Sequence, residues 1–321
     1  MVGALQRRLV ASLLVVSGLT GLGYSAVSAL IAVHLVYETP KPVTTTPASL
    51  GLTFREVAFP SRTDHLMLQG WFIPGVRGDG QLTAHRAIVM VHGTRQNRTD
   101  SGAHELELSA ALARRGFAIL AFDMRGMGQS PPAPLSFGSL ESRDVEGAVD
   151  FLRFGSVPFP ELGRPRIIGA WGVSMGAATL ILAAAREQAI AAVVADSPYA
   201  DIVPLLEREV PKRNVPTAFT LGALSAAEIV YGVDYFGSKP VDAIGRLAPR
   251  PLLLIHGLSD QYVPLTNSNA LYSAATAPAN AHVTRWLVPG GTHAQAFPRN
   301  KTEYLTRVVA FVDQALGLDA L

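Results

Sequence analysis

The chain has 321 residues, of which 49% are hydrophobic and 16% are charged, and its net charge is +2. This composition excludes a disordered or fibrous protein, and the low, scattered charge offers nucleic acid no basic stripe to bind. The absence of cysteine excludes disulfides, thiolate metal sites and a cysteine nucleophile. Any chemistry must therefore come from other side chains.

The first expected element is a membrane anchor over residues 1–37. Residues 9–36 carry no Asp, Glu, Lys or Arg, and as a helix they would extend about 42 Å, more than the hydrocarbon core of a bilayer. Arg7 and Arg8 precede them, so the positive-inside rule predicts a single-pass protein whose large carboxyl-terminal part lies outside the cytoplasm. A cleaved signal peptide is the alternative, because residues 26–29 are small. Continued apolarity up to Val36 favours the anchor.

After the anchor, a Pro- and Thr-rich linker is expected at 38–51 and a catalytic domain at 52–321. Residues 54–59 and 66–74 are typical of a strand hairpin. Short apolar strands then alternate with helices. The strands are expected at 86–93, 117–126, 166–173, 191–197, 251–257 and 282–291, and the helices at 104–116, 142–153, 178–188 and 302–316. This alternation predicts an α/β fold whose mostly parallel sheet is flanked by helices, with an active site at the carboxyl ends of the strands.

The sequence Gly-Val-Ser-Met-Gly at 172–176 stands between an expected strand and an expected helix. The pattern Gly-x-Ser-x-Gly is weak evidence by itself in a chain with 29 glycines. A sharp strand-to-helix bend, however, needs small residues two positions before and after it, and this bend would expose the hydroxyl of Ser174. Free amides of the helix, including that of Met175, would point at a bound oxyanion. We therefore predict that Ser174 is a nucleophile rather than an inert residue of a tight turn.

A serine nucleophile requires a general base and an acid that orients the base, both at strand ends. His293 follows the last strand in a glycine-rich loop and is the expected base. His92 is expected to hold the oxyanion loop, and His256 to belong to a buried turn. Asp260, just beyond the fifth buried strand, is the expected acid, because it gives the chain order Ser, Asp, His. Asp196, at the end of the fourth, is the rival acid.

Six ordered motifs between residues 54 and 316 resemble those of the α/β-hydrolase superfamily. They are VMVHGT, FDMRGMGQS, GVSMG, DSPYAD, IHGLSDQYVP and GGTHAQAF. The pattern is most similar to the compact branch of esterases and prolyl-oligopeptidase-like serine hydrolases, and to its membrane-anchored single-domain members. The resemblance implies an oxyanion hole formed by the backbone amides of Thr94 and Met175, with Arg95 as an alternative to Thr94. It also implies a small cap at about 198–250, and neither a cofactor nor a metal.

Other conspicuous residues are expected to be structural. Arg125, in the DMRGMG motif, is expected to fix a loop beneath the site. Arg95 and Arg98 are expected on the solvated surface rather than in a site for an anionic substrate. Tyr199 and Phe137 are expected either to line an acyl pocket or simply to belong to the core.

The predicted function is hydrolysis of a small-molecule acyl ester through an acyl-enzyme intermediate. Ser174 would attack the acyl carbonyl, His293 would carry the proton to the leaving group, and Asp260 would orient the imidazole. A serine peptidase, an acyl transferase or a thioesterase of the same fold is the alternative, because all of these share the motifs. A non-catalytic, membrane-anchored binding module is a third possibility, which the presence of all three residues disfavours.

Overall fold

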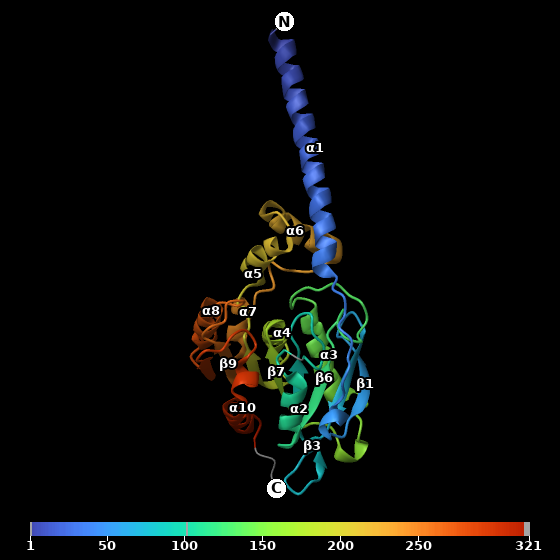
Figure 1. Cartoon of the computed structure of the whole chain (residues 1–321), viewed down its shortest axis with the longest axis vertical. Helices are drawn as coiled ribbons and strands as arrows, with labels where there is room; N and C mark the ends of the chain where they lie inside the picture. The colour runs from blue at the N-terminus through green and yellow to red at the C-terminus, as the bar shows by residue number, and fades with distance from the viewer. Residues whose placement is uncertain (1, 101, 318–321) are drawn as a thin grey trace.

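The computed structural model describes residues 2–100 and 102–317, with residues 2–5 and 7–9 described in their backbone only (Figure 1). Its first element, α1 (Val2–Val36), is a long helix that projects away from the folded body. Residues 10–27 of this helix are exposed. The segment Val10–Val36 is long and apolar enough to cross a membrane, a property that membrane anchors and signal sequences share.

An eight-stranded sheet forms the centre of the folded body. Its strands are β1 (Arg55–Pro60), β2 (Met67–Ile73), β5 (Arg86–Val91), β6 (Phe117–Phe122), β7 (Ile167–Val173), β8 (Ile190–Asp196), β9 (Leu252–Gly257) and β10 (Val283–Val288). The order across the sheet is β1-β2-β6-β5-β7-β8-β9-β10. Strand β2 is antiparallel to both its neighbours, and the other pairs are parallel. The predicted mostly parallel sheet is therefore confirmed. A separate hairpin pairs β3 (Gly75–Val76) with β4 (Leu82–Thr83).

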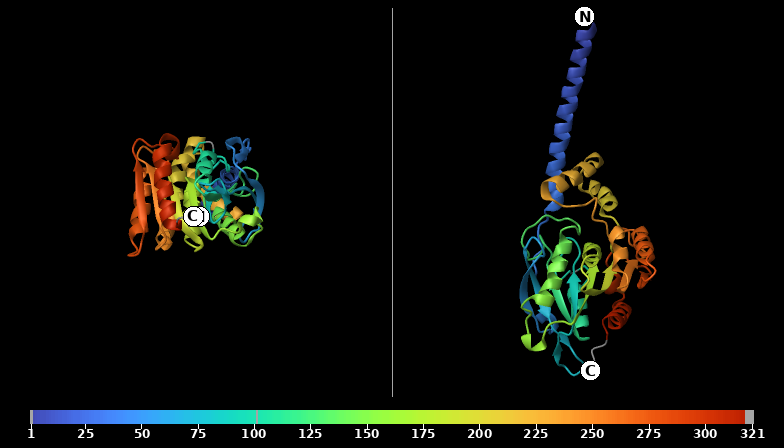
Figure 2. Two further views of the ribbon diagram at one scale, coloured as in Figure 1. Left: turned by 90° about the horizontal axis from the view of Figure 1, so that it is seen from below. Right: turned by 180° about the vertical axis from the view of Figure 1, so that it is seen from behind.

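The central strands are apolar along their whole length because both faces of the sheet are covered by helices. Every residue of β5, β6 and β9 is buried. The helices are α2 (Glu105–Ala113), α3 (Glu141–Phe154), α4 (Met175–Ala184), α8 (Leu265–Thr276), α9 (Ala296–Arg299) and α10 (Lys301–Leu316). Apolar side chains of α3, α4 and α8 pack in one core cluster, and those of α2 and α10 in the other. These two clusters form the layers on either side of the sheet (Figure 2).

The strand order reverses direction at β5, because the chain places β6 on one side of it and β7 on the other. In open sheets of this kind, ligands bind at the carboxyl ends of the strands where the order reverses. The segment between β8 and β9 lies over this edge (Figure 1). It comprises α5 (Ile202–Glu209), α6 (Thr220–Tyr231) and α7 (Pro240–Ala243), with short 3₁₀ helices at Pro211–Arg213, Thr217–Phe219 and Ile244–Leu247. We call α5 and α6 the cap helices.

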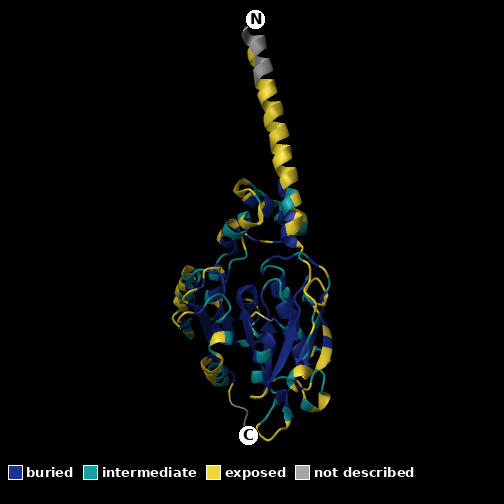
Figure 3. Ribbon diagram, viewed as in Figure 1, coloured by how far each residue is buried: buried dark blue, intermediate teal, exposed yellow. Residues whose placement is uncertain are grey.

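The end of α1 is packed into the folded body, while its upper part stands free (Figure 3). Ala32, Leu35 and Val36 are buried and belong to the same core cluster as α3 and α4. This end of α1 lies against cap helix α6, where Gly222 permits the close approach: a Cβ at Gly222 would lie 2.5 Å from the Oγ of Ser28. The last turns of the apolar helix are therefore part of the core.

Candidate active site

The predicted bend is present between β7 and α4, and Ser174 occupies it. Its backbone angles are φ 54° and ψ −121°, a conformation that a non-glycine residue adopts only when its surroundings enforce it. The flanking glycines are sterically required. A Cβ at Gly172 would lie 2.7 Å from the carbonyl oxygen of Gly176, and a Cβ at Gly176 would lie 2.1 Å from that of Val91.

The structure brings Ser174, His293 and Asp260 together in one hydrogen-bonded chain. The Oγ of Ser174 lies 2.8 Å from Nε2 of His293, and Nδ1 of His293 lies 2.8 Å from Oδ2 of Asp260. Because a carboxylate only accepts hydrogen bonds, the imidazole proton sits on Nδ1, and Nε2 is free to accept the serine proton. This arrangement can activate a hydroxyl as a nucleophile and stabilise the imidazolium that forms.

The loop after β9 fixes the carboxylate of Asp260. Its Oδ1 accepts hydrogen bonds from the backbone amides of Tyr262 and Val263, at 3.0 and 2.8 Å. The Asp260 side chain is fully buried, whereas that of His293 keeps 23% of its surface exposed. The acid is therefore held rigidly beneath the base, and the base faces the open side of the site.

The rival acid, Asp196, makes other contacts. It accepts hydrogen bonds from the hydroxyls of Ser197, at 2.8 Å, and Tyr304, at 3.0 Å. The hydroxyl of Ser197 in turn accepts from the amide of Ala294, next to His293, at 3.3 Å. Burial raises the pKa of Asp196 to about 6, although both hydrogen bonds lower it. Asp196 thus supports the loop that carries the histidine.

Two further histidines lie near this edge in structural positions. His92 is fully buried: its Nδ1 lies 2.8 Å from the carbonyl oxygen of Gly93, and its Nε2 accepts from the amide of Met124 at 3.0 Å. His256 contacts the carbonyl oxygen of Val263 through Nε2 at 2.9 Å. Burial lowers the pKa of both imidazoles. Their contacts are those of side chains that hold loops, as the sequence predicts.

The amides expected to form an oxyanion hole lie beside the serine. A Cβ at Gly93, directly before Thr94, would lie 3.7 Å from the Cβ of Ser174. Met175 is the first residue of α4, so its amide is one of the free donors of that helix. Within the described residues, the backbone amides of Thr94 and Met175 have no hydrogen-bond acceptor. Both are thus available to a bound group.

Comparison with known proteins identifies the family. A model described as serine aminopeptidase, S33, matches residues 83–225, and a model of the prolyl oligopeptidase family matches residues 160–319. The uncharacterized protein YfhR of Escherichia coli K12 is 31% identical over 257 residues, which are 79% of each chain. The chain belongs to the α/β-hydrolase superfamily. It is a hydrolase of the esterase and prolyl-oligopeptidase-like branch.

Other α/β hydrolases extend this comparison. The esterase Pf2001 of Pyrococcus furiosus has the same fold, with a TM-score of 0.70 and 22% identity, over 88% of this chain and 99% of the esterase. The lysophosphatidylserine lipase ABHD12 of Macaca fascicularis is 27% identical over 220 residues, which cover 63% of this chain and 48% of the lipase.

Of the two arginines expected on the solvated surface, Arg95 keeps 40% of its side-chain surface exposed, whereas Arg98 corrects the expectation. Arg98 is buried, donates to the carboxylate of Asp123 at 3.0 Å, and lies 4.3 Å from the ring centre of Trp71. A carboxylate and an aromatic face together compensate a guanidinium for lost water. Arg95 pairs with Glu38 at 2.6 Å, so it holds the chain that leaves α1.

Arg125 fixes the loop after β6, as predicted. Its guanidinium pairs with Asp144 of α3 and with Asp64 of the β1–β2 turn, each at 2.6 Å. Asp144 also accepts a hydrogen bond from the backbone amide of Arg125, at 2.9 Å. The loop beneath the site is therefore tied to both a helix and a turn.

A narrow cavity of about 30 Å³ lies beside the hydrogen-bonded chain. Thr94 is one of its walls, and Tyr262 is another, with its ring centre 4.8 Å from that of His293. Phe137 also lines it, whereas Tyr199 is buried in the core and donates its hydroxyl to the carbonyl oxygen of Phe137 at 2.6 Å. The remaining lining combines apolar and charged side chains: Leu35, Ile202, Leu205, Leu206 and Val210, with Arg95, Glu209 and Arg213.

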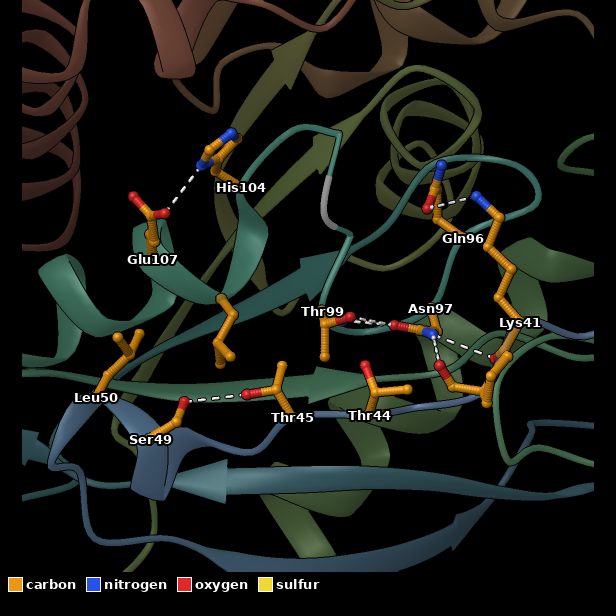
Figure 4. A pocket seen from close by; sticks show the side chains of 12 residues that line it. Lys41, Thr44, Thr45, Ser49, Leu50, Gln96, Asn97, Thr99, His104 and Glu107 are labelled. Carbon is orange, nitrogen blue, oxygen red and sulfur yellow. Dashed lines mark hydrogen bonds and ion pairs between the residues drawn. The ribbon is translucent and has the colours of Figure 1, made fainter.

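A larger, open pocket of about 480 Å³ lies between residues 41–50 and 96–107 (Figure 4). Its polar groups bond one another: Asn97 donates to the carbonyl oxygens of Lys41 and Pro42, at 3.2 and 3.1 Å. Neither Ser174 nor His293 lines it. Ser174 and His293 do not line the narrow cavity either, but two of its walls adjoin the candidate site: Thr94 of the oxyanion loop, and Tyr262, whose ring packs on that of His293.

Sequence reasoning missed two residues of this site. Tyr262 stands two positions after Asp260 in the same loop, so its place beside the acid could have been inferred from the motif. Leu35 carries no such signal, because it lies in the segment assigned to the membrane. Only the packing of α1 against the cap helices reveals that this residue reaches the cavity.

Proposed function

We propose that this α/β hydrolase is a membrane-anchored serine esterase. The observation that carries the proposal is the chain Ser174–His293–Asp260, with two 2.8 Å contacts, at a strained bend between strand and helix. Strain of this kind costs about 1–3 kcal/mol and persists where function requires it. A nucleophilic hydroxyl, an imidazole within hydrogen-bond reach of it and a buried carboxylate that orients the imidazole are the parts that a serine nucleophile needs.

In the proposed reaction, the Ser174 oxygen attacks the acyl carbonyl while His293 takes its proton at Nε2. The amides of Thr94 and Met175 then stabilise the negative charge on the carbonyl oxygen. His293 returns the proton to the leaving alcohol, which departs and leaves the acyl group on Ser174. A water molecule, deprotonated by the same imidazole, releases the acid and restores the serine.

The choice of an ester as substrate is supported by the lining of the narrow cavity. Five of its eleven lining residues are Leu, Ile or Phe, which suit an acyl chain, and the charged Arg95, Glu209 and Arg213 complete the wall together with Thr94, Val210 and Tyr262. Two of the matched proteins are named an esterase and a lipase. The second candidate is a serine peptidase, because both matching family models are described as peptidase families.

The retained anchor is supported by the burial of the end of α1. Cleavage near residues 26–29 would separate Tyr24 from the cap, where its hydroxyl donates to the carbonyl oxygen of Ala218 at 2.8 Å. It would also leave Leu35 and Val36 in a short, fraying helix, although both are core residues. An uncleaved, single-pass anchor with the catalytic domain outside the cytoplasm fits these contacts and the arginines at 7 and 8.

The test is labelling of the full-length protein with a fluorophosphonate probe, followed by peptide mass spectrometry. Wild type should carry the adduct on Ser174, and Ser174→Ala should lose it together with at least 10⁴-fold of esterase turnover. Ser273→Ala is the control, because Ser273 is an exposed serine of α8 that does not belong to the hydrogen-bonded chain. Turnover of p-nitrophenyl esters and of aminoacyl amides separates the two candidates; exclusive amide turnover would refute the esterase.

A further inference from the structure

Cap helix α6 carries an exposed apolar stripe that nothing in the folded body covers. Leu221, Ser225 and Ile229 follow one another at every fourth position, so they lie on one face of the helix. Leu221 is 48% exposed and Ile229 is 85% exposed, and the neighbouring Val230 is 60% exposed. The opposite face, with Ala223, Leu224 and Ala227, is buried.

The one acidic residue of α6 does not make this stripe polar. The carboxylate of Glu228 accepts hydrogen bonds from the backbone amides of Tyr235 and Phe236, at 2.7 and 3.0 Å. The helix contains no lysine or arginine. A helix surface without charges and with large exposed aliphatic side chains is costly to leave in water.

The length of α1 places this stripe at the surface of a bilayer. From Arg8 to Ser28, the first side chain of α1 buried by the folded body, there are 20 residues, or about 30 Å of helix. This matches the hydrocarbon core of about 30 Å. A membrane spanned by this part of α1 therefore ends where α6 begins to pack against α1 (Figure 1).

Aromatic and basic residues lie near the point where α6 begins to pack against α1. Tyr24 stacks on Phe219 with ring centres 5.0 Å apart, directly before α6, and aromatic rings gather at membrane–water interfaces. Lys212 and Arg213, in the turn between α5 and α6, keep 62% and 43% of their side-chain surface exposed, although Lys212 pairs with Glu209 at 2.8 Å and Arg213 lies 3.8 Å from Glu38. Basic residues near the surface are attracted to anionic headgroups by about 1 kcal/mol each.

We propose that α6 is a membrane-docking helix whose stripe Leu221–Ser225–Ile229 enters the bilayer interface beside α1, so that the enzyme takes its acyl ester from the membrane. This inference rests on the proposed esterase and names its substrate class, a membrane-resident acyl ester. The route is short, because the narrow cavity is lined by Leu35 of α1 and by Leu205 and Leu206 of α5. Both helices contact α6 (Figure 1).

The docking test uses the absence of cysteine from the chain. Full-length Leu221→Cys and Ile229→Cys variants, labelled with an environment-sensitive fluorophore, are reconstituted in 3:1 phosphatidylcholine–phosphatidylglycerol vesicles. Phe154→Cys, 63% exposed at the end of α3, is the matched control. Brominated lipids should quench the two α6 labels at least twofold more than the control. Equal quenching overturns the proposal, as does a blue shift without quenching, which would indicate that a second copy of the chain covers α6.

The substrate test compares p-nitrophenyl palmitate embedded in the vesicles with soluble p-nitrophenyl acetate. Ile229→Glu should lower the ratio of palmitate to acetate turnover at least fivefold, and Phe154→Glu should leave that ratio within twofold of wild type. An unchanged ratio for Ile229→Glu overturns the proposal. Fluorophosphonate labelling of the same samples reports on the serine separately: labelled Ser174 without quenching at α6 refutes docking alone, and unlabelled Ser174 refutes the esterase.

Discussion

Asp260 and Asp196 both follow buried strands, yet only one of them contacts the imidazole. Asp260 lies 2.8 Å from His293, whereas Asp196 is occupied by the hydroxyls of Ser197 and Tyr304. Asp260→Asn should therefore lower kcat by about 10³–10⁴-fold, because the imidazole loses the carboxylate that fixes its tautomer. Asp196→Asn should lower kcat by less than tenfold. The rate of fluorophosphonate labelling of Ser174 measures both effects. If Asp196→Asn lowered this rate more than Asp260→Asn, Asp196 would be the residue that orients His293.

Asp196 should instead make stability depend on pH. Its pKa is about 6 in the folded protein and 3.8 in the unfolded chain, so the folded state holds the proton through this interval. Stability from this group is therefore present below pH 3.8 and is lost as the pH rises to 6, by about 3 kcal/mol at most. The difference in unfolding free energy between wild type and Asp196→Asn, measured in urea at pH 4 and pH 7, should change by that amount. If the difference in unfolding free energy between the two proteins did not change with pH, the raised pKa of Asp196 would be contradicted.

At the residue scale, a site residue can be predicted from the sequence when a reactive side chain directly follows a predicted parallel strand. Ser174, Asp260 and His293 could be chosen because parallel strands bring their carboxyl ends to one edge. Arg98 could not be placed, because its burial depends on a carboxylate 25 positions away and on the face of Trp71. Partners that are distant in the sequence cannot be inferred from the residues around Arg98.

At the scale of elements, the contact between α1 and α6 depends on the absence of a side chain at Gly222. A Cβ there would lie 2.5 Å from both the Oγ of Ser28 and the hydroxyl of Tyr24. Gly222→Val should therefore displace the side chains of Ser28 and Tyr24, break the hydrogen bond from Tyr24 to Ala218, and destabilise the fold by about 0.5–1.5 kcal/mol. Gly21→Val is the control, because no atom lies within 4 Å of a Cβ at that position. The two variants are compared by thermal unfolding in the same detergent. Equal unfolding midpoints would exclude a tight contact between α1 and α6.

The order of strands and helices was readable from the sequence because buried parallel strands are continuous apolar runs. Helix α8 has no counterpart among the predicted elements, since Leu265–Thr276 mixes small and polar residues without a clear apolar face. The stretch expected as a free linker is held against the body: Glu38 pairs with Arg95, and Asn97 bonds the carbonyl oxygens of Lys41 and Pro42. The proline content of residues 38–51 predicts an extended backbone, but it does not predict which part of the folded body this segment contacts.

At the scale of the whole molecule, the structure joins the end of the apolar helix α1, the cap helices and the central sheet into one packed unit. The core cluster that contains α3 and α4 also contains Ala32, Leu35 and Val36. Removing α1 by cutting the chain near residue 38 would therefore remove part of the core. A sequence can indicate that a helix is apolar enough for a membrane, but not which of its turns the protein itself buries.

This continuity predicts different outcomes for two truncations. A chain lacking residues 1–21 keeps the buried turns of α1, whereas a chain lacking residues 1–37 loses Leu35 and Val36, which contribute about 1.5–3 kcal/mol each on burial. In the same detergent, the longer deletion should lower Tm by about 6–12 °C relative to the shorter one. It should also speed proteolysis at residues 211–219, because α6 loses the surface on which it rests. Equal Tm values and equal cleavage rates would show that the last turns of α1 do not contribute to the stability of the folded body.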